Sequence, residues 1–209
     1  TGITSITLPE GITSIPATTF WKCAALTSIH IPATVTSIGS QAFSECISMT
    51  SVIFDTYTNE KDGNDYARVK NIGYQAFEKT KLTSFAFPTL EGTSTITLGY
   101  KLFQYCGELT TVSLSKSIGE IGQAFDNNTS IKSFVVAADS KNFSAEGQIL
   151  YNADKTAIRA IMGLLEGAYE IPAGVKEINE YAFRGQVGLT AIIIPASVTK
   201  IGKYAFENC

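Results

Sequence analysis

The sequence predicts a β-solenoid of about eight stacked units of roughly 23 residues. Residues 26–48 and 189–209 agree at almost every apolar position, although they lie far apart in the chain. Self-similarity at a fixed period of about 20–50 residues is typical of solenoids. The units begin at Ile3, Leu26, Met49, Leu82, Leu109, Ile131, about Glu166 and Leu189.

Three insertions account for the irregular spacing of the units. Successive starts lie 23, 23, 33, 27, 22, 35 and 23 residues apart, so the base period is 23. The extra residues fall at about 55–66, 89–95 and 138–163, and each insertion leaves the flanking pattern in phase. Loops or β-hairpins that project from a stack behave in this way. We therefore expect one solenoid domain over residues 1–209.

Each unit opens with a predicted strand. Its six residues nearly alternate in polarity and are rich in β-branched side chains, as in 26–31, which favours a short strand. Proline cannot donate a hydrogen bond to a strand ladder, so a proline that follows should end the strand. The prolines in this position are Pro9, Pro32, Pro88, Pro172 and Pro195.

The second half of each unit is a return segment. It carries an apolar residue, then Ile-Gly, then Ala-Phe, and this spacing of three and four predicts helical or 3₁₀ turns on the convex side. The strands should pair in parallel on the concave face, because a single unit cannot bury its own apolar side. The phenylalanines should form one interior ladder: Phe20, Phe43, Phe77, Phe103, Phe125, Phe183 and Phe206.

The repeat resembles a known family. The unit L-T-S-I-x-I-P-x-x-V-T-x-I-G-x-x-A-F-x-x-C is similar to the BspA-like class of leucine-rich repeat, and residues 139–161 resemble an insert that recurs between such repeats. The resemblance implies a leucine-rich-repeat solenoid. It also implies a secreted or cell-surface protein of a host-associated bacterium that adheres to host proteins, other cells or matrix.

Composition excludes several classes of function. Charged residues make up 17% of the chain and the net charge is −3, so no basic face is available for nucleic acid or for an anionic membrane surface. No apolar run approaches the roughly 20 residues that span a bilayer. One histidine, His30, makes histidine-centred catalysis and multi-histidine metal sites improbable.

The cysteines share one position in the repeat. Cys23, Cys46, Cys106 and Cys209 occupy it, and other units place Thr80, Asn128 or Gln186 there. A position shared by thiol, hydroxyl and amide groups indicates interior side chains that bond loop backbone. No C-x-x-C pair suggests zinc, and parallel Cβ vectors argue against a disulfide between neighbouring units.

The insertion at 55–66 concentrates oxygen ligands around Gly63, as a calcium loop would. It lacks the alternating spacing and terminal glutamate of an EF-hand, so a solvated turn-rich loop is the preferred interpretation. We predict no catalytic residue, no metal site and no cofactor.

Two surfaces are candidates for binding. The third and fifth residues of each strand should face outward and form a flat, uncharged face. Its predicted contacts are Ser28, His30, Ser51, Ile53, Ser84, Ser113, Val135 and Ile193. Alternatively, Ser and Thr merely suit exposed strands. The loops at 55–66 and 138–163, with Tyr57, Tyr66 and Tyr151, form a rival site because loops on rigid scaffolds commonly carry recognition.

These features favour a non-enzymatic extracellular binding module that is monomeric and recognises a host or matrix protein or glycoprotein. The alternatives are a structural spacer that displays another domain and, more remotely, a hydrolase or carbohydrate-active enzyme. Solenoids need polar caps, and neither end of this sequence resembles one, so we expect a fragment of a longer surface protein.

Overall fold

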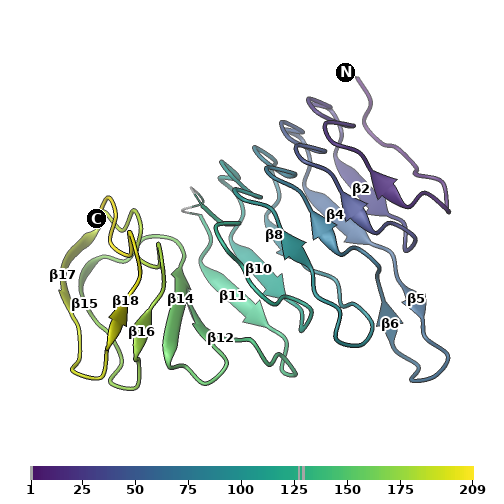
Figure 1. Ribbon diagram of the computed structural model, residues 1–209. Coiled ribbons are helices and arrows are strands. Elements are labelled where there is room, and N and C mark those ends of the chain that lie inside the picture. The colour runs from purple at the N-terminus through teal and green to yellow at the C-terminus, as the bar shows by residue number, and fades with distance from the viewer. Residues whose placement is uncertain (1, 127, 129) are drawn as a thin grey trace.

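The computed structural model describes residues 2–126, 128 and 130–209, and it forms a solenoid whose turns stack along one axis (Figure 1). Most turns carry a first strand, just before the proline position, and a second strand at the Ile-Gly position. The first strands are β2 (Ser28–Ile31), β4 (Ser51–Phe54), β8 (Ser84–Ala86), β10 (Thr111–Leu114), β11 (Ser133–Val136), β15 (Gly167–Glu170) and β17 (Leu189–Ile193).

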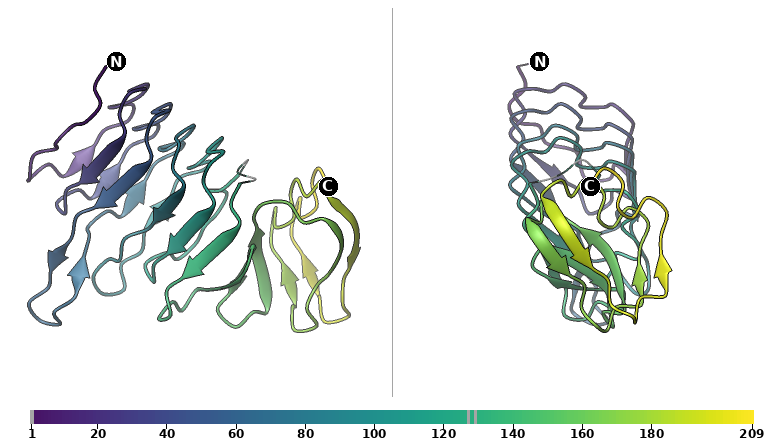
Figure 2. Two further views of the ribbon diagram at one scale, coloured as in Figure 1. Left: turned by 180° about the vertical axis from the view of Figure 1, so that it is seen from behind. Right: turned by 90° about the vertical axis from the view of Figure 1, so that its left-hand side faces the viewer.

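The second strands line the opposite side of each turn, and all but β14 are two residues long. They are β1 (Ser14–Ile15), β3 (Ser37–Ile38), β7 (Asn71–Ile72), β9 (Thr97–Leu98), β14 (Ala157–Ile161), β16 (Glu177–Ile178) and β18 (Lys200–Ile201). The insertions add two hairpins, β5 (Tyr57–Thr58) with β6 (Asp65–Tyr66) and β12 (Phe143–Glu146) with β13 (Ile149–Asn152). Figure 2 shows the successive turns both from behind and along the stack.

The predicted parallel pairing between turns is confirmed. First strands pair as β2–β4, β8–β10–β11 and β15–β17, and second strands as β1–β3–β7–β9 and β14–β16–β18. Proline ends β2 as expected: the carbonyl oxygen of Pro32 accepts a 2.9 Å hydrogen bond from the Val35 backbone N–H, which closes a tight turn. Pro172 and Val175 repeat this bond at 3.0 Å.

The prediction of helical turns is wrong, because the described residues contain no α- or 3₁₀-helix. The Ala-Phe segment instead forms consecutive turns. Residues two before and two after the phenylalanine have positive φ, such as Gln41 at 56° and Glu45 at 60° around Phe43. Left-handed residues at this spacing interrupt any right-handed helical run, although side-chain spacing alone cannot reveal them.

The first unit lacks its predicted strand. Residues 2–9 contain no strand, and Ile3 is 47% exposed. The Thr27 backbone N–H donates a 3.1 Å hydrogen bond to the carbonyl oxygen of Thr4, so the segment still runs beside β2. The first unit therefore contacts β2 without forming a first strand of its own.

The core contains two phenylalanine stacks, which corrects the single ladder that the repeat predicted. Five rings from Phe20 to Phe125 stack in order with centroids 5.2, 5.4, 5.9 and 5.8 Å apart. Phe183 and Phe206 form a second stack at 5.0 Å. The insertion 138–163 separates the stacks. The Ile161 backbone N–H donates to the Ala182 carbonyl oxygen as that of Phe183 donates to Ala205, so the interrupted unit places isoleucine at the phenylalanine position.

This interruption, formed by residues 137–163, is called the seam below. Buried apolar residues form one cluster on its N-terminal side and another on its C-terminal side, and the insertion contributes to both. β11 and β15 do not pair across the seam, nor do β9 and β14. The solenoid therefore consists of two regular stacks joined by an irregular segment.

Candidate binding surfaces

The exposed face of the first strands carries most of the predicted contact residues. Parallel pairing aligns Ser28 with Ser51 and His30 with Ile53. In the adjoining sheet it aligns Ser84 with Thr111 and Ser113 with Val135. These residues are exposed or half-buried, whereas the alternate positions Ile29 and Val112 are buried. The face therefore consists mostly of small side chains, and none of these positions holds Asp, Glu, Lys or Arg.

Three exposed apolar side chains stand out on this face. Ile53 is 43% exposed, Val135 is 54% exposed and Ile193 is 56% exposed. Ile53 and Val135 lie on the N-terminal stack. Ile193 lies on β17, beyond the seam, where its register partner is Glu170 of β15. The structure thus places Ile193 in a separate sheet from the other two.

His30 has an acidic partner that the repeat pattern did not reveal. Its Nδ1 lies 3.0 Å from Oδ1 of Asp55, the residue that follows β4. The His30 side chain is 63% exposed, so the pair faces solvent. Among the described residues the His30 side chain makes no other hydrogen bond, and no serine or cysteine joins the pair.

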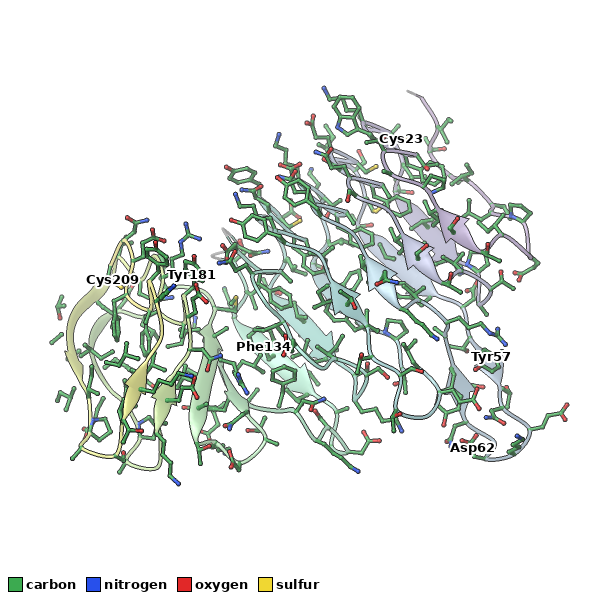
Figure 3. All side chains as sticks on the ribbon, viewed as in Figure 1. Cys23, Tyr57, Asp62, Phe134, Tyr181 and Cys209 are labelled. Carbon is green, nitrogen blue, oxygen red and sulfur yellow. The ribbon has the colours of Figure 1, made fainter. Side chains whose placement is uncertain are left out.

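Side chains of the β5–β6 hairpin bond both within the hairpin and to residues outside it. The Tyr57 hydroxyl donates to Oε2 of Glu91 at 2.8 Å, and the Arg68 guanidinium lies 3.7 Å from the centre of the Tyr57 ring. The Tyr66 hydroxyl donates to Oδ2 of Asp62 at 2.7 Å. Figure 3 shows Tyr57 and Asp62 at the projecting end of the molecule. The Asn64 backbone and then the Tyr66 hydroxyl lower the pKa of Asp62.

Two of the three predicted loop contacts are not on the surface. Tyr66 is 5% exposed and Tyr151 is 2% exposed, so their expected placement as surface contacts is wrong. Tyr66 folds back onto its hairpin, and Tyr151 on β13 packs in the C-terminal core. The inserts bury these rings because a two-stranded hairpin needs packing against the rest of the protein to be stable. Tyr57 alone retains partial exposure.

The repeated cysteine position is structural. Thiols of Cys46, Cys106 and Cys209 donate hydrogen bonds of 3.0–3.1 Å to the phenylalanine carbonyl oxygen of the preceding turn. At the same position Asn128 donates to the Phe103 carbonyl oxygen. The four cysteines are free, and Cys23 and Cys209 lie at opposite ends of the stack (Figure 3). This confirms the hydrogen-bonding role inferred from the shared position.

Within the described residues, no group of three or more His, Cys, Asp or Glu is arranged to hold a metal ion. The same part of the chain has no helix that could span a membrane.

Comparison with known families agrees with the geometry. A model of the BspA type leucine-rich repeat region matches six copies, over residues 1–67, 64–152 and 167–209. The chain belongs to the BspA-type leucine-rich-repeat family. This family accounts for the parallel strands, the Ile-Gly and Ala-Phe positions and the 23-residue period. No curated protein matches the chain.

Several solved structures share the fold. A leucine-rich repeat protein from Eubacterium ventriosum is 28% identical, with a TM-score of 0.74, and the match covers 98% of this chain and 51% of that one. The pneumococcal vaccine antigen PcpA is 21% identical (TM-score 0.60; 88% and 48% covered). The leucine-rich repeat protein of T. pallidum is 20% identical (TM-score 0.50; 99% and 76% covered). The chain spans about half the length of the first two proteins.

Proposed function

We propose that this BspA-type leucine-rich-repeat chain is a non-enzymatic binding module at the surface of a bacterial cell, and that it holds a host or matrix protein against the first-strand face. The observation that carries the proposal is the in-register, uncharged face on which Ile53 and Val135 are exposed. Exposed apolar side chains on a rigid surface with few charges are typical of the centre of a protein interface.

The shape of the face supports this proposal. Parallel strands hold the serine and threonine positions in fixed rows, so a partner would meet a surface that needs little ordering on binding. Small hydroxyl side chains allow close approach and offer hydrogen bonds at the rim. Contact energy should therefore concentrate on the few large residues, Ile53 and Val135, with His30 beside them.

The test measures capture of matrix proteins. Immobilised fibronectin, laminin and collagen are probed with the wild-type chain and with an Ile53→Glu, Val135→Glu double variant. We expect at least one partner to bind, and the variant to bind it about tenfold more weakly or worse, because two charges would be buried in the contact. Thermal unfolding confirms that the variant is folded.

The matched control is Val187→Glu, at a side chain that is 71% exposed and lies in the turn before β17, beyond the seam from Ile53 and Val135. It should bind as the wild type does. Capture of none of the three proteins, or equal loss in both variants, would contradict the proposal. A structural spacer is the second candidate: it predicts that the longer protein keeps its adhesive activity when Ile53 and Val135 are replaced.

A further inference from the structure

A cleft opens where the seam interrupts the second-strand sheets. The first sheet ends at β9 and the second begins at β14, and between them lies a cavity of about 400 Å³, here called the seam cleft. Small-molecule sites commonly enclose about 300–1,000 Å³. The polar side chains that line the seam cleft are Glu120, Gln123, Asn142, Arg159, Asn179 and Glu180.

Two of these residues break a rule of the repeat. In regular turns the residue after the second strand is glycine, as at Gly39, Gly73 and Gly202, where an added Cβ would lie 2.3–2.5 Å from backbone of the preceding turn. In the two turns that carry β14 and β16, the same position holds Arg159 and Asn179 instead, directly after the register partners Ile158 and Ile178. Arg159 and Asn179 thus place polar side chains in the cleft at a position where close stacking leaves room only for glycine in the regular turns.

The cleft contains hydrogen-bonding groups without partners. Oδ1 of Asn179 is buried and accepts no hydrogen bond in the described part of the chain. Arg159 is exposed, and none of the ion pairs among the described residues includes it. By contrast, Nδ2 of Asn142 donates to the Ile118 carbonyl oxygen at 3.1 Å, which fixes one wall. Buried polar groups without partners are exceptional in folded proteins and favour a bound polar molecule.

The mixture of charges selects the class of ligand. A simple anion would be attracted by Arg159 but repelled by the carboxylates of Glu120 and Glu180, and a simple cation would meet the reverse. A neutral molecule with many hydroxyl groups avoids both penalties. Each hydroxyl both donates to carboxylate or amide oxygens and accepts from guanidinium or amide N–H groups. A saccharide has this chemistry.

One pair of stacked tyrosines lies at the cleft. Tyr181 lines it and stacks on Tyr204, with centroids 5.3 Å apart. The Arg184 guanidinium lies 5.2 Å from the Tyr181 ring centre. Rings with apolar faces and polar tips suit a molecule that has C–H faces and hydroxyl edges.

We propose that the seam cleft binds a neutral oligosaccharide, with Arg159 and Asn179 as its main polar contacts and Tyr181 as a contact for a sugar ring. This site is separate from the first-strand face and does not depend on the protein-binding role proposed for that face. In Figure 3, Tyr181 marks the edge of the molecule at which the site lies.

Saturation-transfer NMR and calorimetry with maltotriose, cellotriose and triacetylchitotriose test the proposal. We expect at least one of the three probes to bind saturably at millimolar concentration or below. Arg159→Ala should weaken this binding about tenfold, because a charged donor is lost. Asn179→Gly, which restores the residue found in regular turns, should weaken it by a similar factor.

The control is Lys81→Ala, which removes an exposed cation from a distant turn and should leave the affinity within about twofold of wild type. Thermal unfolding of each variant shows whether it is folded. If Arg159→Ala does not fold, the saccharide affinity of Asn179→Gly tests the proposal. Failure of all three probes to saturate at about 20 mM would overturn the proposal, as would binding that is unchanged in both cleft variants. Ile53→Glu should leave saccharide binding unaltered.

Discussion

Arg184 and Asp126 form an ion pair across the seam. Nη1 of Arg184 lies 2.8 Å from Oδ2 of Asp126, although 58 residues separate them, and Nε of Arg184 lies 2.7 Å from Oε2 of Glu207. The Asp126 side chain is only 13% exposed. Burial raises the pKa of Asp126, and the Arg184 charge opposes that rise. One guanidinium therefore connects the two stacks of the solenoid.

Arg184→Ala should lower the free energy of unfolding by about 1–3 kcal/mol at pH 7, because it leaves a mostly buried carboxylate unpaired. Because the pKa of Asp126 is raised in the folded protein, this carboxyl group favours folding at pH values below its ordinary pKa of 3.8. That contribution to stability is lost as pH rises through the folded-state pKa. Removal of Arg184 raises that pKa further. The loss should thus be largest near neutral pH and shrink below about pH 4, as urea unfolding at several pH values would measure.

Asp126→Asn is the control for this pH dependence, because its amide cannot ionise. In that background Arg184→Ala should cost less and show little pH dependence. An equal cost at pH 3.5 and pH 7 in the wild-type background would show that the pair does not act through charge.

Gly39→Ala should destabilise the N-terminal stack. The added Cβ would lie 2.3 Å from the backbone nitrogen of Ala17, and backbone cannot move aside without disturbing the stacking of turns. We expect a loss of about 1–3 kcal/mol and a lower Tm. Gly174→Ala, where nothing lies within 4 Å of the new Cβ, should change stability by no more than about 0.5 kcal/mol. Similar Tm values for the two variants would refute the steric explanation.

Phe77→Ala should be among the most damaging single changes. The ring is fully buried and stacks between Phe43 and Phe103 at 5.4 and 5.9 Å. Its removal leaves a cavity that flanking turns cannot close, so about 3–5 kcal/mol should be lost. Tyr105→Ala, at a side chain that is 60% exposed, serves as the comparison and should be nearly neutral. Calorimetric unfolding measures both.

Cys46 should resist thiol reagents in the folded protein. Burial, with a smaller effect from the nearby Cys23, raises the pKa of Cys46 to about 12. Little thiolate is then present at pH 8, and the thiolate is the reactive form. Cys209 is exposed and should react quickly. A chromogenic disulfide reagent should therefore react rapidly with one thiol, and Cys209→Ser should abolish this rapid reaction. Rapid labelling of Cys46 in the folded protein would contradict the prediction.

Repetition made much of the fold predictable. The strand, proline and apolar positions recur in the 23-residue units, so an ambiguous unit can be assigned by comparison with its neighbours. The turn after Pro32 and the hydrogen bond of Cys46 are predictable in this way. The candidate face followed from the same logic, since strand alternation assigns Ile53 and Val135 to the outside. The conformation of the turns could not be predicted, because side-chain spacing does not indicate the positive φ of Gln41 and Glu45.

The sequence by itself determined the architecture, because a periodic pattern of buried residues can be satisfied only by stacking turns in register. Where the period fails, only the tertiary structure decided the outcome. The insertion at 138–163 has no neighbouring copy to define its place, so long-range packing set the burial of Tyr151, the division of the phenylalanine stack and the separation of Ile193 from Val135. The same packing brought Arg159 and Asn179 to one cleft and Arg184 to Asp126.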